Sequence, residues 1–491
     1  MAARPHKALV LTAVCLGQFM IQLDLTIVNV ALPSIGQDLG ASAYGLQWVI
    51  DGCSLALASL LLLGGRIGDR SGHKRVYLSG LVIFGVGSGL CALAPSLGWL
   101  IGARVLQGIG GAIELPATLA ILTQTFTDER ERAQAVGIWA GAAGSSLVVG
   151  PVLGGGLIAG VGWPAVFVVN LPIAVVIGLL ILATVTEAVE PDTGGLDVPG
   201  QVLGAAALGL LAGGAIEGGR QRFASGLALG LFAAGAASLA AAFIAVEHRR
   251  ADPMLPLAFF GRAAYSAANA VGLVMGFVTF GILFVFSLFF QQVQGDSAIA
   301  AGLRFLPLTI AFVIAGPLVG RVIDRVGHGT PMAVGCVLMG VGTLLLLLVN
   351  PGSGYGPVWW PFVIIGLGYG LTSTPMAAAV LGAVPSERAG MASSTNLAAR
   401  VAGGVFGIAV LGALLPTTSP AHAGGRPFAV TFTAGLHSAL TLGGVVALAG
   451  AALAAAFIRT RPDQASDGAD RDSGRDIATD GAAGRAGWSD G

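Results

Sequence analysis

Four ionisable residues lie inside long apolar stretches in the N-terminal quarter of the chain: Asp24, Asp51, Arg104 and Glu114. An ionised side chain in the hydrocarbon core of a membrane costs roughly 2.5–3.5 kcal/mol on insertion scales, so such residues usually serve ion or proton transfer. A carboxyl group whose surroundings change can bind a proton on one side of a membrane and release it on the other. The four residues therefore point to proton chemistry.

The depths of these residues suggest separate roles. At ~1.5 Å per helical residue, Asp24 lies a little past the middle of its stretch, and Asp51 and Arg104 share one depth. We expect Asp24 to be the main proton carrier and Arg104 to tune the carboxylates, chiefly Asp51. Glu114 lies deeper and is a candidate second proton or cation site. The alternative for Asp51 and Arg104 is a buried ion pair that only fixes helix packing.

The whole chain has the composition of a helical membrane protein. Of its 491 residues, 55% are hydrophobic and 10% are charged, whereas soluble domains carry about 25% charged residues. Disorder needs low hydrophobicity and is excluded for most of the chain, and the net charge of zero gives no sign of a nucleic-acid partner. Apolar runs long enough to cross a bilayer lie at 9–32, 44–63, 76–94, 97–122, 133–158, 164–185, 198–216, 224–246, 265–290, 300–319, 331–349, 358–381, 390–415 and 435–458. The sequence predicts an all-α integral membrane protein with fourteen transmembrane helices.

The distribution of Arg and Lys predicts the orientation. With both termini in the cytoplasm, nineteen basic residues fall on the cytoplasmic side and three on the other, as the positive-inside rule requires. We expect a six-helix half at 1–190, two inserted helices and a cytoplasmic linker at 191–262, and a second six-helix half at 263–458. The charged tail at 459–491 is expected to be disordered.

A short repeat supports this division. Residues 65–73 read GRIGDRSGH and residues 320–328 read GRVIDRVGH, which is six identities in nine positions. Each copy follows an apolar run that ends at the predicted cytoplasmic face. Parallel repeats of this kind occur in transporters with two similar halves.

Six motifs carry a resemblance to a known family. They are LDLTIVNVALPSI (23–35), GRIGDRSGHKRVYL (65–78), RVLQGIGGA (104–112), GPVLGG (150–155), FVVNLPI (167–173) and QQVQGDSAIAAGLRFLP (291–307). In this order the chain resembles the major facilitator superfamily, and within it the fourteen-span drug:proton antiporters. The resemblance covers residues 8 to about 458. It departs from the family pattern at Ser146 and Gly68, where Gly and Ala are usual, and neither change removes a charge.

The resemblance implies a proton-driven exporter of small amphipathic molecules such as antibiotics. It implies a multi-pass protein of the cell membrane, with no cofactor beyond the proton gradient and no obligate protein partner. It also implies a conformational latch at the two repeated loops, comprising Gly65, Asp69, Arg70, Gly72, Lys74, Arg75, Asp324 and Arg325. Positive-inside bias alone is the simpler explanation for the basic residues of the first loop. Gly150, Pro151, Gly154 and Gly155 form a candidate hinge, since proline kinks a helix and glycine admits close packing; plain small-residue packing is the alternative.

The substrate path is less marked in the sequence. Phe277, Phe280 and Phe284 share one helix face and could stack on a drug, although a lipid-facing stripe fits them equally well. The remaining candidates for substrate contact are polar or charged: Gln22, Asn29, Asn170, Gln291, Asn396 and Arg400.

Other classes of function fit less well. A proton-coupled or passive importer of a metabolite is the alternative within transport, and the GPVLGG motif and the number of spans argue against it. The sequence contains no HExxH, no GxSxG with suitable partners and no GxxxxGK[ST], which argues against a membrane enzyme and an ATP-driven pump. Its four cysteines and six histidines form no metal-binding pattern.

Overall fold

The computed structural model describes residues 3–187, 198–220, 226–249, 257–384, 389–416 and 426–458. Every regular element in these ranges is helical. The α-helices are α1 (Ala3–Asp38), α2 (Ala43–Ser71), α3 (His73–Ala92), α4 (Leu97–Thr125), α5 (Glu129–Val161), α6 (Ala165–Val168), α7 (Asn170–Thr184), α8 (Val198–Arg220), α9 (Gly226–Arg249), α10 (Leu257–Phe260), α11 (Ala263–Leu288), α12 (Ala298–Arg304), α13 (Leu306–Val326), α14 (Gly329–Leu345), α15 (Gly356–Gly382), α16 (Ala389–Ala413) and α17 (Arg426–Phe457). A π-helical turn, η1 (Phe289–Val293), extends α11, and a 3₁₀ turn, η2 (Leu346–Leu348), extends α14.

The described residues contain eleven to twelve candidate membrane helices. Eleven are long and apolar enough to cross a bilayer, and α5 is the twelfth if its two arms, which meet at 41°, count as one span. The arms meet between Ser146 and Val149. Pro151 lacks the N–H that would bond to the carbonyl four residues earlier, at position 147, and this explains the bend.

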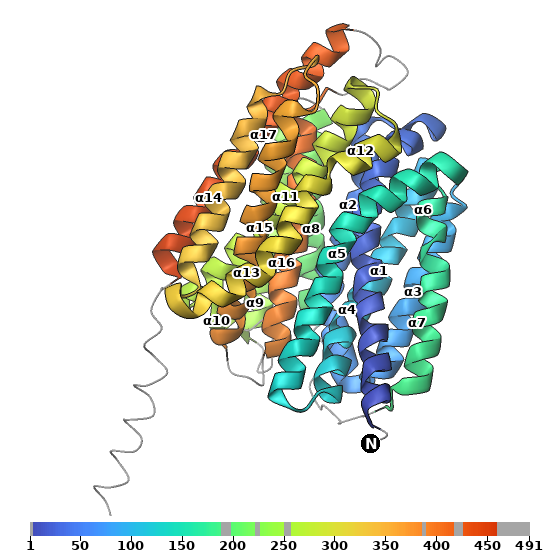
Figure 1. The fold of residues 1–491 in the computed structure, drawn as a ribbon, viewed down its shortest axis with the longest axis vertical. Helices are drawn as coiled ribbons and strands as arrows, with labels where there is room; N and C mark the ends of the chain where they lie inside the picture. The colour runs from blue at the N-terminus through green and yellow to red at the C-terminus, as the bar shows by residue number, and fades with distance from the viewer. Residues whose placement is uncertain are drawn as a thin grey trace, which may run out of the picture.

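The packing of the first seven helices recurs in the last seven. The close pairs α1–α5, α2–α4 and α3–α4 have counterparts in α11–α16, α13–α15 and α14–α15. In Figure 1 the blue-to-teal bundle stands beside the yellow-to-red one, with α12 reaching across to α5 at the end away from the N-terminus. The repeated loop motif takes part in this recurrence. Gly72 ends α2 with φ +92° and Gly327 ends α13 with φ +73°, a conformation that glycine adopts without a Cβ penalty.

Two further helices, α8 and α9, lie within the predicted insertion at 191–262. They pack on each other, and α8 also contacts α2 and α16, one helix from each bundle. The side chain of Gln201 on α8 donates a hydrogen bond to the carbonyl of Ser59 on α2. The predicted boundary between residues 190 and 191 and the predicted tail at 459–491 lie outside the described residues.

Candidate functional site

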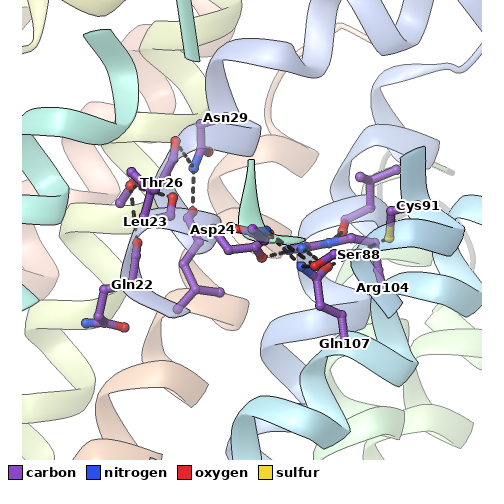
Figure 2. Close-up of polar contacts among 12 residues, drawn as sticks. Gln22, Leu23, Asp24, Thr26, Asn29, Ser88, Cys91, Arg104 and Gln107 are labelled. Carbon is purple, nitrogen blue, oxygen red and sulfur yellow. Dashed lines mark hydrogen bonds and ion pairs between the residues drawn. The ribbon is translucent and has the colours of Figure 1, made fainter. Parts of the chain in front are cut away.

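The polar centre of the first bundle is built around Asp24, in the middle of α1. Asp24 is fully buried and forms an ion pair with Arg104 of α4 through Oδ2. Its other oxygen, Oδ1, accepts hydrogen bonds from Gln107 Nε2 at 2.7 Å and from Asn170 Nδ2 at 3.0 Å. The carboxyl group is thus held by three donors from two neighbouring helices, and Figure 2 shows Asp24 pointing toward Arg104 and Gln107.

Arg104 and Gln107 extend this centre into a network. Arg104 donates from Nε to the carbonyl of Val49 on α2 at 2.9 Å and from Nη1 to Gln107 Oε1 at 2.6 Å. Gln107 in turn donates to Ser88 Oγ on α3 at 2.8 Å. Five helices, α1 to α4 and α7, therefore meet at one buried charge pair. Sequence reasoning missed Gln107, although it follows Arg104 by one helical turn, and missed Ser88, which carried no signal.

The expected partnership of Arg104 with Asp51 is not formed. Arg104 pairs with Asp24, and both carboxyl oxygens of Asp51 lack a hydrogen-bond partner among the described residues although the side chain is fully buried. The depths along the helices were suitable, but rotation about the axis decides which side chains meet. Asp51 follows Gln47 by one turn, and Gln47 faces the carbonyl of Ile408 on α16 at 3.3 Å. Asp51 thus belongs to the face of α2 that meets the second bundle.

Glu114 stands apart from this network. It is fully buried on α4, and neither of its oxygens accepts a hydrogen bond of ordinary geometry from the described residues. The side chain of Tyr77, on α3, lies beside it.

The first repeated loop is bound to its own bundle. Lys74 donates to the carbonyls of Val185 at 2.5 Å and Leu182 at 3.2 Å, at the end of α7. Glu187 accepts a hydrogen bond from the backbone N–H of Arg75 at 3.2 Å and lies 3.7 Å from its guanidinium. Glu187 thereby caps the start of α3, a role that the sequence analysis did not assign.

The other latch candidates make few contacts that the structure describes. Arg70 is exposed, and a Cβ on Gly65 would lie 3.6 Å from Pro116, which is ordinary contact. The side chains of Asp69, Asp324 and Arg325 lie outside the described part of the structure.

The hinge candidates lie where α5 touches both bundles. A Cβ on Gly150 would lie 2.1 Å from Thr26 Oγ1 of α1, and one on Gly154 would lie 2.7 Å from Ile27 of α1. A Cβ on the next residue, Gly155, would lie 2.5 Å from the Cα of Ile299 on α12. Pro151 is buried in the same segment, just past the bend.

The three phenylalanines of the α11 stripe face protein. Phe277 and Phe284 are buried and Phe280 is half-buried. Phe280 packs on Gly404 of α16, and Phe284 packs on Gly412 of the same helix. A lipid-facing stripe is therefore excluded, and packing of α11 on α16 occupies these rings.

The polar substrate candidates divide into three groups. Asn170 belongs to the Asp24 network. Asn29 and Gln291 lie at the contact between α1 and α11, where Ser287 donates to the carbonyl of Asn29 at 2.5 Å and Gln291 donates to that of Val30 at 3.2 Å. Of the remaining three, Asn396 is buried and donates to Asn269 at 3.4 Å, whereas Gln22 and Arg400 are half-buried.

The polar contacts described between the two bundles lie toward one end. They join Gln47 to α16 and Asn29 and Val30 to α11 and η1. All belong to the half of the molecule away from the N-terminus, where α12 also meets α5 (Figure 1).

Comparisons with known proteins assign the family. The chain belongs to the Major Facilitator Superfamily, whose family model matches residues 14–408. By family it is thus a membrane transporter and not an enzyme. Among solved structures the fold is similar to a bacterial homologue of the human lysosomal transporter Spinster, with a TM-score of 0.67, 18% identity and coverage of 93% of this chain and 98% of that one. A D-xylose–proton symporter gives a TM-score of 0.65 at 14% identity, over 92% and 98% of the two chains.

Curated relatives are more similar in sequence. The methylenomycin A resistance protein of Streptomyces coelicolor is 36% identical over 410 residues, covering 83% of this chain and 86% of the relative. The tetracenomycin C resistance and export protein of Streptomyces glaucescens is 34% identical over 499 residues, covering 92% of each. The drug efflux pump JefA of Mycobacterium tuberculosis is 34% identical over 412 residues, covering 84% of this chain and 81% of the pump.

Proposed function

We propose that this protein exports small amphipathic molecules, antibiotics among them, in exchange for protons, with Asp24 as the proton carrier. The observation that supports this most is the buried Asp24–Arg104 pair at the meeting point of five helices. The names of relatives that confer resistance or export drugs support the class of substrate. The relatives' direction of transport argues for export over import.

The network supplies a way to couple a proton to helix movement. Asp24 accepts hydrogen bonds on both oxygens, which is the pattern of an ionised carboxylate, because that group is acceptor-only. A proton on Asp24 would turn one acceptor into a donor and remove the counter-charge of Arg104. The contacts of α1 with α4 and α7 would then have to rearrange, and this change would open one side of the transporter and close the other.

The finer architecture belongs to the same proposal. α8 and α9 are 23 and 24 residues long, enough for ~35 Å of helix, and we infer that they complete a set of fourteen spans between two six-helix halves. The termini face the cytoplasm and the protein resides in the cell membrane. It requires no cofactor and no obligate protein partner. Gly150, Pro151, Gly154 and Gly155 serve as the hinge, and the two repeated loops, with Asp69 and Asp324, as the latch.

The proton gradient is strong enough for the task. One elementary charge moved across 100 mV supplies about 2.3 kcal/mol, which sustains roughly a 50-fold gradient of a neutral drug for each proton exchanged.

The test is drug-induced proton movement in respiring inside-out vesicles that hold either the wild type or Asp24→Asn. A panel of antibiotics and dyes is added while the luminal pH is recorded. The proposal expects the wild type to release luminal protons as a drug enters the vesicles, and Asp24→Asn, at equal membrane content, to release none. Equal release by both proteins would remove Asp24 from coupling. Wild-type vesicles that take up drug without moving protons would overturn antiport.

A further inference from the structure

Besides Asp51, the first bundle contains another buried carboxyl group that the Asp24 network does not reach, that of Glu114. Glu114 of α4 has no exposed surface and no hydrogen bond of ordinary geometry to its oxygens among the described residues. Tyr77 of α3 is also fully buried, and its hydroxyl donates a long bond, 3.5 Å, to the carbonyl of Ala13. An acid and a phenol thus lie together in the interior with their hydrogen-bonding capacity largely unused.

A glycine makes this arrangement possible. A Cβ placed on Gly17 of α1 would lie 2.1 Å from the Tyr77 hydroxyl oxygen and 2.7 Å from Glu114 Oε1. Both oxygens therefore occupy the space that a side chain at position 17 would fill. Helix α3 also lies close to the backbone of α4, since a Cβ on Gly80 of α3 would lie 2.7 Å from the backbone nitrogen of Glu114. Helices α1, α3 and α4 are so close here that an organic substrate would have to separate them, whereas a proton needs no such space.

The two carboxyl groups are stacked along one interface. Gly17 precedes Asp24 by seven residues on α1, and Glu114 follows Gln107 by seven residues on α4. Because the two helices run in opposite directions, both steps lead two turns, about 10 Å, toward the end of the molecule that holds the N-terminus. Glu114 and Tyr77 thus lie between the Asp24 network and that end.

We propose that Glu114 is a second proton-binding site, with Tyr77 as its hydrogen-bond partner, and that each exchange cycle moves its proton in addition to that of Asp24. An ionised carboxylate with a phenol as its neighbour and no cation beside it among the described residues is strongly disfavoured in such an interior, so the site holds the neutral acid in this conformation. The O–H bond of the acid breaks when a helix movement admits water, which takes the proton. Tyr77 then donates its hydroxyl hydrogen bond to the carboxylate that remains. The stoichiometric part of this proposal rests on the proposed function, and the binding part does not.

Infrared spectroscopy of the purified full-length protein tests binding without any transport. A protonated carboxyl group has a C=O band separate from that of a carboxylate. We expect the wild type at neutral pH to show a band that Glu114→Gln removes, that Tyr77→Phe shifts, and that Asp24→Asn and Asp51→Asn leave in place. A wild-type spectrum without a band assignable to Glu114 would overturn the second site, whatever the protein transports.

Reconstituted vesicles test the stoichiometry. At 100 mV and equal pH, two protons per neutral drug sustain a gradient of about 2,000-fold and one proton about 50-fold. Glu114→Gln is expected to lower the limiting drug gradient from about 2,000-fold to about 50-fold while export continues. Gly17→Ala should act in the same direction, because its methyl group displaces both oxygens without removing a titratable group.

Gly111→Ala is the matched control, since its Cβ would meet only apolar atoms, at 3.3 Å from Leu57 and 3.6 Å from Ile21, and it should keep the wild-type gradient. An equal limiting gradient in the wild type and Glu114→Gln would overturn the second coupled proton. A wild type that moves no protons at all would instead refute the proposed function, while the infrared result still decides the binding site.

Discussion

The two bundles share a packing pattern and differ in what fills their interiors. The first holds four buried ionisable residues: Asp24, Asp51, Arg104 and Glu114. Among the described residues of the second, no carboxyl group is fully buried. There a cluster of phenylalanines has neighbouring ring centroids 5.2–6.3 Å apart: Phe286, Phe289, Phe290, Phe305, Phe362 and Phe432.

This difference indicates a division of labour. A polar network has alternative hydrogen-bonded arrangements, so a proton can switch it, whereas packed aromatic rings gain their energy from one close-packed arrangement. We infer that the first bundle senses the proton and that the second moves as a rigid body. Helix α5 lies at the seam between the bundles, because its glycines meet both α1 of its own bundle and α12 of the other.

The largest expected effect follows from leaving one buried charge alone. Arg104→Gln leaves Asp24 without its counter-charge, and breaking a buried pair from one side costs about 3–5 kcal/mol of stability. We expect a large fall in the thermal unfolding temperature in detergent, together with loss of export. The double variant Asp24→Asn/Arg104→Gln should recover most of the stability and none of the export.

The matched control for this prediction is Arg400→Gln. Arg400 is half-buried, and no described residue forms an ion pair with it. The unfolding temperature of the Arg400→Gln variant should therefore differ little from that of the wild type. An Arg104→Gln variant as stable as the wild type would mean that pairing with Arg104 does not stabilise the buried Asp24 carboxylate.

The second prediction concerns the aromatic interior. The ring of Phe362 contacts those of Phe286, Phe290 and Phe305 at 5.2–6.3 Å. Phe362→Ala in a soluble core would cost about 3–5 kcal/mol, and somewhat less here because lipid, unlike water, does not penalise an exposed ring. We expect a clear loss of thermal stability with an unchanged number of protons released per exported molecule.

Trp359→Ala, at a half-exposed residue of the same helix, should alter stability far less. A changed proton count in Phe362→Ala would contradict the division of labour, because it would place part of the coupling in the second bundle.

The elements of this comparison differ in how far the sequence predicts them. Asp24 and Arg104 could be identified because a charge in an apolar run is rare, and the membrane helices because their runs are long. The partner of Arg104 was predicted wrongly, because residue counting gives depth along a helix and not rotation about its axis. Gln107 and Ser88 were missed because amides and hydroxyls are common in membrane helices. The face of the Phe277 stripe depends on where α16 packs, which no local pattern contains.

A third prediction tests the contact of α5 with α1, beside the seam. Gly150→Ala would place a methyl group 2.1 Å from Thr26 Oγ1, and overpacking of this kind costs about 1–3 kcal/mol. If α1 and α5 must slide past each other during the cycle, we expect turnover to fall by about tenfold or more. Gly156→Ala is the control on the same helix, since nothing lies within 4 Å of its Cβ. Equal turnover in both variants would exclude tight α1–α5 packing from the rate-limiting movement.

The smallest expected effect lies at the one charge pair of the second bundle that the structure describes. Asp296 and Arg304 are 2.8 Å apart, between η1 and α12. Burial raises the pKa of Asp296 above its ordinary value, and the nearby Arg304 lowers it by less. The folded protein therefore binds this proton more tightly than the unfolded chain, whose Asp has a pKa of about 3.9. Stability should consequently fall as pH rises from about 3.9 through the raised pKa, and level off above it.

Asp296→Asn should remove this decline. The decline in the wild type should be smaller than about 1 kcal/mol, because the pair is partly exposed to water. Thermal unfolding of both proteins from pH 4 to pH 7 measures the difference. The neighbouring Tyr355 does not interfere, since burial raises its pKa to about 12 and it stays protonated throughout. A wild type that instead gains stability over Asp296→Asn as pH rises would show that pairing with Arg304 outweighs burial. The second bundle would then contain a favourable charge pair like that of the first.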